Sequence, residues 1–181
     1  MRQKVVTSYF EMTGREQLRP ARPATGLSVL RAGTPCPELN RFLYTGVGGD
    51  WYWIDRLSWS HERWMEWLGR EEVETWVGYR EGNPVGYFEL ERQAAGDLEL
   101  AYFGLLPQFI GRGLGGPLLT RAIERGFEAG ARRVWVHTCS LDHPAARNNY
   151  LARGFRLYRE EEEWKDLPEA SPGPWPGARP S

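Results

Sequence analysis

The sequence has little cysteine, no long apolar run and no large excess of charge of either sign. Its 181 residues include two cysteines, Cys36 and Cys139, which are too few for a disulfide framework and favour a reducing compartment. No apolar run approaches the roughly 18 residues that a membrane-crossing helix needs. Met1 to Phe10 also lacks the apolar centre of a signal peptide. We therefore expect a cytoplasmic protein without a membrane partner.

The charge balance argues against nucleic acid as a partner. Lysine and arginine total 23, aspartate and glutamate total 24, and the net charge is −1. Proteins that bind nucleic acids or anionic membranes through general electrostatics need a large basic excess, which this chain lacks. Hydrophobic residues make up 41% and charged residues 26%, which are ordinary values for a globular protein.

The length fits one domain, and the composition changes near the C-terminus. We expect a single domain over residues 1–166, in which residues 1–26 supply an N-terminal strand and a connector. Residues 167–181 are rich in proline and glycine, which predicts a flexible, solvated tail.

Hydrophobic periodicity predicts an α/β fold in which hairpin strands are followed by alternating helices and strands. The expected helices cover one or two turns within 35–44, then 61–68, 114–127 and 144–153. The expected strands cover residues 4–12, 27–31, 75–80, 85–91, 97–106, 134–138 and 155–159.

The most informative segment is the glycine-rich turn Leu106-Pro107-Gln108-Phe109-Ile110-Gly111-Arg112-Gly113-Leu114-Gly115-Gly116. It follows a strand and opens a helix, whose free N–H groups and dipole form a site for a phosphate or pyrophosphate. A P-loop would end in Gly-Lys-Ser/Thr, and a dinucleotide fingerprint would open the first βαβ unit. A turn without a ligand, and a turn that binds acyl-CoA, are the remaining interpretations.

Three features follow one another along the chain: the acidic strand from Glu99 to Pro107, the glycine-rich turn with its helix, and the segment from Pro144 to Phe155 with Tyr150 before Gly154-Phe155. In this order they resemble the GNAT N-acetyltransferase superfamily. The resemblance implies the GNAT fold, an α/β architecture with a mixed, mostly antiparallel central sheet flanked by helices. It also implies acetyl-CoA as the cosubstrate.

The resemblance further implies which residues bind acetyl-CoA. The pantetheine arm would lie along Phe103, Gly104 and Leu105, with the Leu105 N–H as donor to the thioester carbonyl. Two positions depart from the family pattern, because Ile110 replaces an arginine or glutamine and His143 replaces an asparagine. The pyrophosphate would lie on Ile110, Gly111, Arg112, Gly113, Leu114, Gly115 and Gly116. His143 stands where many relatives have an asparagine that contacts the pantetheine arm.

Acetyl transfer to an amine requires a base for the ammonium and an acid for the departing thiolate. The resemblance places Glu99 at the base position and Tyr150 at the acid position, with Glu89 and Glu91 as alternative bases. Simple alternation along the strand puts Glu99, Ala101 and Phe103 on one face, opposite Leu98, Leu100 and Tyr102.

Six of the nine tryptophans lie between Trp51 and Trp76. We expect Trp64 and Trp67 to pack in a small core. Three residues in this region, together with one on a later strand, are candidates for enclosing and steering the acceptor: Trp51, Trp53, Asp55 and His137.

The cluster His137, Cys139, Asp142 and His143 also fits a zinc site or a Cys-His nucleophile, but no second ligand pair exists elsewhere among only three histidines. We therefore expect no metal. Asp142 or His143 is more simply a helix cap.

Together these features predict an acetyltransferase that moves an acetyl group from acetyl-CoA to a primary amine of a small molecule by direct transfer in a ternary complex. A protein or peptide amine, and a non-catalytic acyl-CoA-binding module, are the alternatives. The sequence is also compatible with a homodimer.

Overall fold

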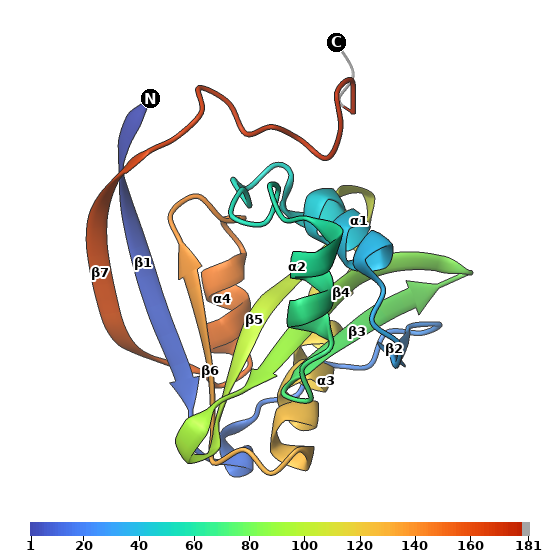
Figure 1. Cartoon of the computed structure of the whole chain (residues 1–181). Helices are drawn as coiled ribbons and strands as arrows, with labels where there is room; N and C mark the ends of the chain where they lie inside the picture. The colour runs from blue at the N-terminus through green and yellow to red at the C-terminus, as the bar shows by residue number, and fades with distance from the viewer. Residues whose placement is uncertain (179–181) are drawn as a thin grey trace.

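The computed structural model describes residues 1–178 and contains one seven-stranded sheet with helices on both faces (Figure 1). No helix in this part of the chain has the length and apolar character needed to span a bilayer. Short 3-10 turns are η1 (Arg15–Gln17), η2 (Ala94–Gly96) and η3 (Pro107–Phe109). The helices are α1 (Pro37–Gly48), α2 (His61–Leu68), α3 (Gly115–Glu128) and α4 (Ala146–Ala152). The strands are β1 (Arg2–Met12), β2 (Ser28–Ala32), β3 (Val73–Arg80), β4 (Asn83–Arg92), β5 (Asp97–Leu105), β6 (Arg133–Cys139) and β7 (Arg156–Asp166).

The sheet is mixed and mostly antiparallel, which confirms the predicted fold class. Its strand order is β2-β3-β4-β5-β6-β1-β7, and the β5–β6 pair is parallel. The N-terminal strand β1 therefore lies inside the sheet, paired with β6 on one side and with β7 on the other. This placement brings residues from the start of the chain next to the centre of the fold.

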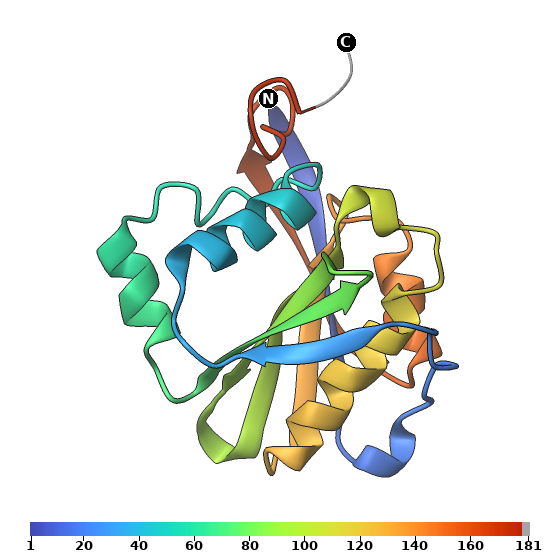
Figure 2. The ribbon, with the colours of Figure 1, turned by 90° about the vertical axis from the view of Figure 1, so that its right-hand side faces the viewer.

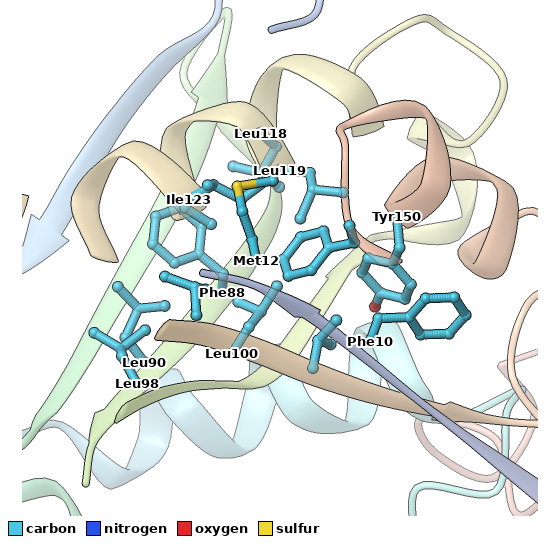
Figure 3. Close-up of a cluster of buried hydrophobic side chains, with 14 residues drawn as sticks. Phe10, Met12, Phe88, Leu90, Leu98, Leu100, Leu118, Leu119, Ile123 and Tyr150 are labelled. Carbon is cyan, nitrogen blue, oxygen red and sulfur yellow. The ribbon is translucent and has the colours of Figure 1, made fainter. Parts of the chain in front are cut away.

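Helices α3 and α4 cover one face of the sheet, and α1 and α2 cover the other (Figure 2). Side chains along β4 alternate between the two faces of the sheet. Phe88 and Leu90 point into the large core beneath α3, whereas Tyr87 packs against α1 on the other face. Figure 3 shows the large core, in which β1 contributes Phe10 and Met12. Burial of these apolar side chains is the main stabilising term for such a layered fold.

A β-bulge in β5 overturns part of the predicted face assignment. In the ladder with β4, Leu100 is opposite Leu90 but Tyr102 is opposite Glu89, so β5 has one residue more than β4 at this point. Such an insertion rotates the following side chains to the opposite face. Tyr102 therefore shares the face of Glu99, and Phe103 packs on the core with Leu100, contrary to simple alternation.

The segment after β7 is not simply solvated, contrary to the prediction for this part of the chain. Ser171 Oγ donates to the carbonyl of Gly49 at 2.6 Å and accepts from the N–H of Tyr52 at 3.1 Å. The N–H of Gly173 donates to the same carbonyl at 2.8 Å. Trp175 remains 60% exposed. The last part of the predicted tail, residues 179–181, lies outside the described residues.

Candidate active site

A cavity of about 630 Å³ lies where β5 and β6 separate. The two parallel strands pair over Asp97–Glu99 of β5 and Arg133–Trp135 of β6. Beyond that ladder, residues 100–105 of β5 and 136–139 of β6 line the cavity from its two sides. The divergence of two neighbouring strands thus creates space for a ligand in the middle of the sheet.

The glycine-rich turn borders this cavity. Gly111 and Gly113 have φ angles of +77° and +74°, a conformation that L side chains rarely adopt, and a Cβ on either would meet no atom within 4 Å. The open space beside both glycines fits a bound phosphate group. The turn leads into α3, whose first N–H groups have no partner within the helix.

The predicted turn residues fall into two groups. Ile110, Gly111, Gly115 and Gly116 line the cavity, as do the predicted pantetheine residues Phe103, Gly104 and Leu105. Arg112, Gly113 and Leu114 do not line it. The Arg112 guanidinium carbon lies 5.6 Å from the centre of the Phe109 ring, and the Leu114 side chain is fully buried. Leu114 can therefore offer a ligand its backbone but not its side chain.

Two residues of the α4 region brace the start of α3 and were not singled out from the sequence. Asn149 Nδ2 donates to the carbonyl of Gly115 at 3.3 Å. A Cβ on Gly116 would lie 2.7 Å from Arg153 Nη1, so the absence of a side chain lets this cation approach the helix terminus. Arg153 adds positive charge near the turn, which favours an anionic ligand.

The backbone of β5 offers a hydrogen-bond donor towards the gap. The N–H of Leu106 donates to the Val85 carbonyl of β4 at 2.9 Å. Because successive N–H groups along a strand point in opposite directions, the N–H of Leu105 is directed away from β4, towards β6. Gly104 has a different reason to be glycine, since a Cβ there would overlap the Val47 side chain of α1.

Tyr150 on α4 reaches the cavity from the core side. Its side chain is 4% exposed and lies beside Phe10 in the large core (Figure 3). The centre of its ring lies 5.8 Å from that of Phe10, 6.2 Å from Phe103 and 5.9 Å from Phe155. Burial raises the pKa of the Tyr150 hydroxyl well above its usual value, and the nearby Asp142 carboxylate raises it further. The hydroxyl is therefore protonated at any ordinary pH.

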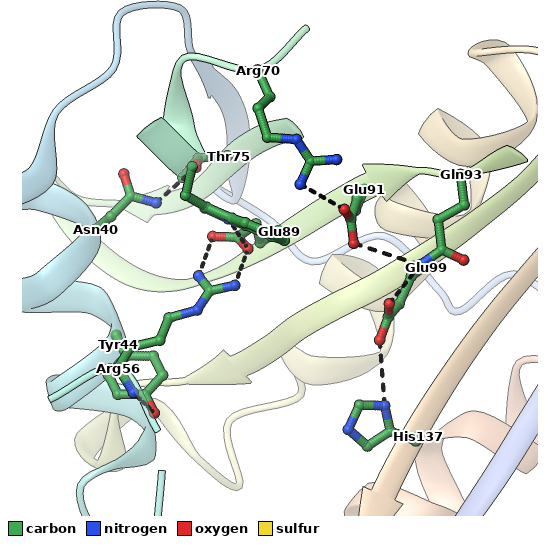
Figure 4. Close-up of polar contacts among 11 residues, drawn as sticks. Asn40, Tyr44, Arg56, Arg70, Thr75, Glu89, Glu91, Gln93, Glu99 and His137 are labelled. Carbon is green, nitrogen blue, oxygen red and sulfur yellow. Dashed lines mark hydrogen bonds and ion pairs between the residues drawn. The ribbon is translucent and has the colours of Figure 1, made fainter. Parts of the chain in front are cut away.

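Glu99 lies on the β5 wall of the same cavity, with its side chain 13% exposed. Its Oε1 is 3.4 Å from Nδ1 of His137, an exposed residue on β6 (Figure 4). Its Oε2 accepts a hydrogen bond from Gln93 Nε2 at 2.9 Å. The structure thus brings the predicted base together with His137, one of the predicted acceptor-binding residues.

The structure separates the two alternative bases. Glu89 is fully buried, and its oxygens accept from both Arg56 Nη atoms at 3.0 and 2.9 Å and from Trp67 Nε1 at 2.9 Å. It does not line the cavity, so a role as general base does not fit it. Glu91 does line the cavity, but its carboxylate pairs with Arg70 at 2.7 Å.

Arg56 anchors the tryptophan-rich segment to the sheet. Its guanidinium carbon lies 4.6 Å from the ring centre of Trp59, 4.7 Å from Trp67 and 4.3 Å from Tyr102. Its backbone N–H also donates to the Tyr44 hydroxyl at 3.2 Å. The expected core role is confirmed for Trp64, which is 2% exposed, whereas Trp67 both packs there and lines the cavity.

The residues just before Arg56 that are predicted to bind the acceptor lie on one side of the cavity. Trp51, Trp53 and Asp55 all line it. Trp53 Nε1 donates to Asp142 Oδ1 at 3.2 Å, and the Trp51 ring lies edge-on to His143 at 4.9 Å. The predicted acceptor residues and the predicted cofactor residue His143 therefore meet in one cavity.

The alternative of a zinc or thiol site on the β6–α4 loop finds little support. Burial raises the pKa of Cys139 to about 11, with the Asp142 charge contributing, so its thiol stays protonated near neutral pH. Asp142 Oδ2 accepts from Thr138 Oγ1 at 2.7 Å and from the Cys139 N–H at 2.8 Å, and His143 Nδ1 accepts from the Ala145 N–H at 3.0 Å. Both side chains thus shape the turn. Within residues 1–178, no group of three or more metal-ligating side chains is arranged around a common point.

Sequence reasoning missed the contribution of the N-terminal strand. Thr7 and Tyr9 of β1 line the cavity, and the Tyr9 ring centre lies 5.8 Å from that of His137. No local pattern identifies these residues, because their position depends on the pairing of β1 with a strand far along the chain.

Comparison with solved structures agrees with the fold of this chain. A GCN5-related N-acetyltransferase from Sphaerobacter thermophilus superposes with a TM-score of 0.64 at 17% identity, over 88% of this chain and 51% of that one. One from Kribbella flavida gives 0.62 at 19% identity, over 86% and 56% respectively. At such identities the likeness shows the fold, which is that of the GCN5-related N-acetyltransferases.

The family follows from the sequence comparison. The model of the acetyltransferase (GNAT) family matches residues 40–155, and the chain belongs to this family. A curated relative, mycothiol acetyltransferase of Corynebacterium aurimucosum, is 38% identical over 66 residues, which are 36% of this chain and 21% of that protein. The chain thus matches about a fifth of that relative and about half of the two solved structures.

Proposed function

We propose that this protein transfers an acetyl group from acetyl-CoA to a primary amine of a small molecule, by direct attack in a ternary complex. The observation that carries the proposal is a single cavity that joins the glycine turn, the Glu99 carboxylate, the buried Tyr150 and the aromatic acceptor wall. Acetyl-CoA would supply the acetyl group as an activated thioester. The turn from Ile110 to Gly116 and the free edge of β5 at Phe103 to Leu105 fit its anionic and amide-rich parts.

Glu99 acts as the general base in this proposal. An amine near neutral pH is mostly an ammonium and cannot attack until it loses a proton. The Glu99 carboxylate lies at the cavity wall, and Oε1 faces the exposed His137. The reaction releases one proton overall, so a base close to an exposed side chain has a route by which that proton reaches solvent.

Tyr150 stabilises the sulfur of the departing thiolate in this proposal. Its raised pKa keeps the hydroxyl protonated, so it always has a hydrogen to offer. Because a thiol is the stronger acid, with a pKa near 8.5, complete transfer from this phenol is unfavourable. Tyr150 therefore stabilises the negative charge on sulfur mainly by donating a hydrogen bond. The Leu105 N–H, directed towards β6, is the matching donor for the carbonyl oxygen.

The acceptor wall suits a small amine with an apolar body. Trp51, Trp53 and Trp67 supply flat apolar surface, and the Asp55 carboxylate attracts the ammonium. An enclosure built of large side chains favours a small molecule over a peptide, which would need an open groove.

An acceptor panel tests the proposal. Purified protein is mixed with acetyl-CoA and phenethylamine, spermidine or a lysine-containing peptide, and release of free thiol is followed. We expect transfer to a small amine. Glu99→Gln should lower turnover by about 10²-fold or more, most strongly at low pH where ammonium dominates. The matched control Glu66→Gln changes an exposed carboxylate on α2 and should be silent.

Two outcomes would contradict parts of this account. Faster transfer to the peptide would exclude the small-molecule acceptor while leaving the chemistry intact. Wild-type turnover of Glu99→Gln across the pH range would remove Glu99 as the base. Tyr150→Phe should lower turnover to a similar extent at every pH tested, because the hydrogen bond that it removes comes from a hydroxyl that stays protonated.

A further inference from the structure

Gln93 lies between the strands that carry the two cavity carboxylates and has no part in the mechanism above. Its backbone N–H donates to the Asp97 carbonyl at 2.8 Å, so the tight turn between β4 and β5 fixes the origin of its side chain. That side chain extends to Glu99 on β5 and to Glu91 on β4 (Figure 4). A tryptophan on β6, Trp135, holds its other end.

The orientation of the Gln93 amide follows from the chemistry of its partners. Trp135 Nε1 lies 3.0 Å from Gln93 Oε1, and an indole N–H can only donate, so the amide oxygen must face it. The amide NH₂ is thereby directed to the carboxylates, at 2.9 Å from Glu99 Oε2 and 3.5 Å from Glu91 Oε2. Trp135 is itself braced by Tyr9 of β1, with ring centres 6.4 Å apart and stacked.

The hydrogen bond from Gln93 makes the two carboxylate oxygens of Glu99 unequal. Oε2 is engaged by Gln93, whereas Oε1 faces His137 Nδ1 at 3.4 Å. A carboxylate on an unrestrained side chain would rotate and present either oxygen. A carboxylate held at one oxygen presents the other in a fixed place, which is what a general base needs.

We propose that Gln93, oriented by Trp135, is a positioning residue that holds the Glu99 carboxylate so that Oε1 receives the proton of the acceptor amine. The inference rests on the proposed function, because it takes Glu99 as the base. Gln93 touches no reacting atom and acts through Glu99 alone.

The test is a double-mutant cycle with the best acceptor of the panel above. Gln93→Met keeps a similar length but cannot form either hydrogen bond. It should lower kcat about threefold to tenfold, which is the worth of one ordinary hydrogen bond. KM for acetyl-CoA should stay unchanged, since the glycine turn lies elsewhere. Trp135→Phe should lower kcat in the same direction, whereas Trp164→Phe, an exposed tryptophan on β7, should not.

The cycle distinguishes positioning from a general structural effect. If Gln93 acts through Glu99, Gln93→Met should cause no further loss of kcat in the Glu99→Gln background. Independent, multiplying losses would overturn the positioning role while leaving Glu99 as the base. Wild-type turnover of Glu99→Gln itself would overturn both the proposed base and this inference.

A spectroscopic measurement needs no acceptor. The side-chain NH₂ signals of Gln93 in a ¹⁵N–¹H spectrum are assigned by their loss in Gln93→Met. They should shift in Glu99→Gln and in Trp135→Phe, and stay in place in Trp164→Phe. Signals that respond to neither of the first two changes would overturn the contact.

Discussion

The proposed cofactor side and the proposed acceptor side of the cavity differ in the groups that form them. The cofactor side consists of backbone: glycines in a turn, a helix N-terminus and the free edge of β5. The acceptor side consists of large side chains held by one buried ion pair, Arg56–Glu89, within a cluster of aromatic rings. A site formed by backbone groups tolerates many changes of side chain around it. A site formed by side chains depends on each residue that holds those side chains in place.

This difference fits the tasks proposed for the two sides. A pyrophosphate and a pantetheine arm are the same for every acetyl-CoA enzyme, so backbone N–H groups suffice to hold them. An acceptor differs from enzyme to enzyme, and side chains are the means by which a cavity selects its ligand. Each side also has an ion pair to the sheet: Arg56 of the tryptophan-rich segment pairs with Glu89, and Arg125 of α3 pairs with Glu74. The contributions of these two ion pairs to stability can be compared directly.

The largest stability effect should come from the acceptor side. Arg56→Met leaves the Glu89 carboxylate buried without its cation, which should lower the free energy of unfolding by about 3–5 kcal/mol. Chemical denaturation measures this. Arg63→Met removes an exposed ion pair with Glu66 and should cost less than about 1 kcal/mol.

The double variant Arg56→Met with Glu89→Met checks the cause. Since neither charge remains, much of the lost stability should return. A double variant as unstable as Arg56→Met alone would show that the aromatic packing around Arg56, and not the unpaired carboxylate, carries the effect.

A smaller effect should come from the ion pair beneath the cofactor side. Burial alone would raise the pKa of Glu74, but hydrogen bonds from Arg125 on α3 and from Trp76 lower it from 4.5 to about 2. The lowered pKa means a stabilisation of about 3 kcal/mol that is complete above pH 4.5 and is lost as the pH falls towards 2.

Glu74→Gln should therefore destabilise at pH 7 by about 2–3 kcal/mol and should flatten the dependence of stability on pH between 5 and 2. Denaturation curves at several pH values measure both. Glu128→Gln, which alters an exposed ion pair of the same helix with Arg121, is the control. An unchanged acid dependence in Glu74→Gln would assign the acid sensitivity to other carboxylates.

The C-terminal segment should have the smallest effect. Deletion of residues 168–181 removes the hydrogen bonds of Ser171 and Gly173 to the loop at Gly49 and Tyr52. Because ordering this segment offsets part of their gain, we expect a loss of about 1 kcal/mol. Ser171→Ala in the full chain should reproduce about half of it. A fall in Tm that corresponds to more than about 3 kcal/mol would make the segment part of the core.

The same contrast explains what the sequence could predict. The turn from Leu106 to Gly116, the helix after it and the Tyr150 segment are local patterns, and the structure places them where those patterns indicated. Local spacing can encode this turn, because Gly111 and Gly113 each adopt a positive φ angle that favours glycine at that residue.

The acceptor side could not be predicted in the same way. Tyr9 enters the cavity through pairing of β1 with β6, and Gln93 is oriented by Trp135 on a distant strand. The bulge that turns Tyr102 towards Arg56 is a tertiary feature without a local signal. Glu89 is an alternative base on the sequence alone, and the contact with Arg56 that buries it joins residues far apart in the chain.

The central claim is that the glycine turn holds acetyl-CoA, and one thermal-shift experiment tests it most directly. Gly113→Glu places a side chain and a negative charge in the turn, and Gly130→Glu makes the same change at a glycine with φ of +86° and open space at the far end of α3. Acetyl-CoA at 100 times its Kd should stabilise the wild type by about 2.7 kcal/mol, because it binds only the folded state. Gly130→Glu should keep that rise in Tm, and Gly113→Glu should lose it. A Gly113→Glu variant that acetyl-CoA stabilises as much as the wild type would contradict the account.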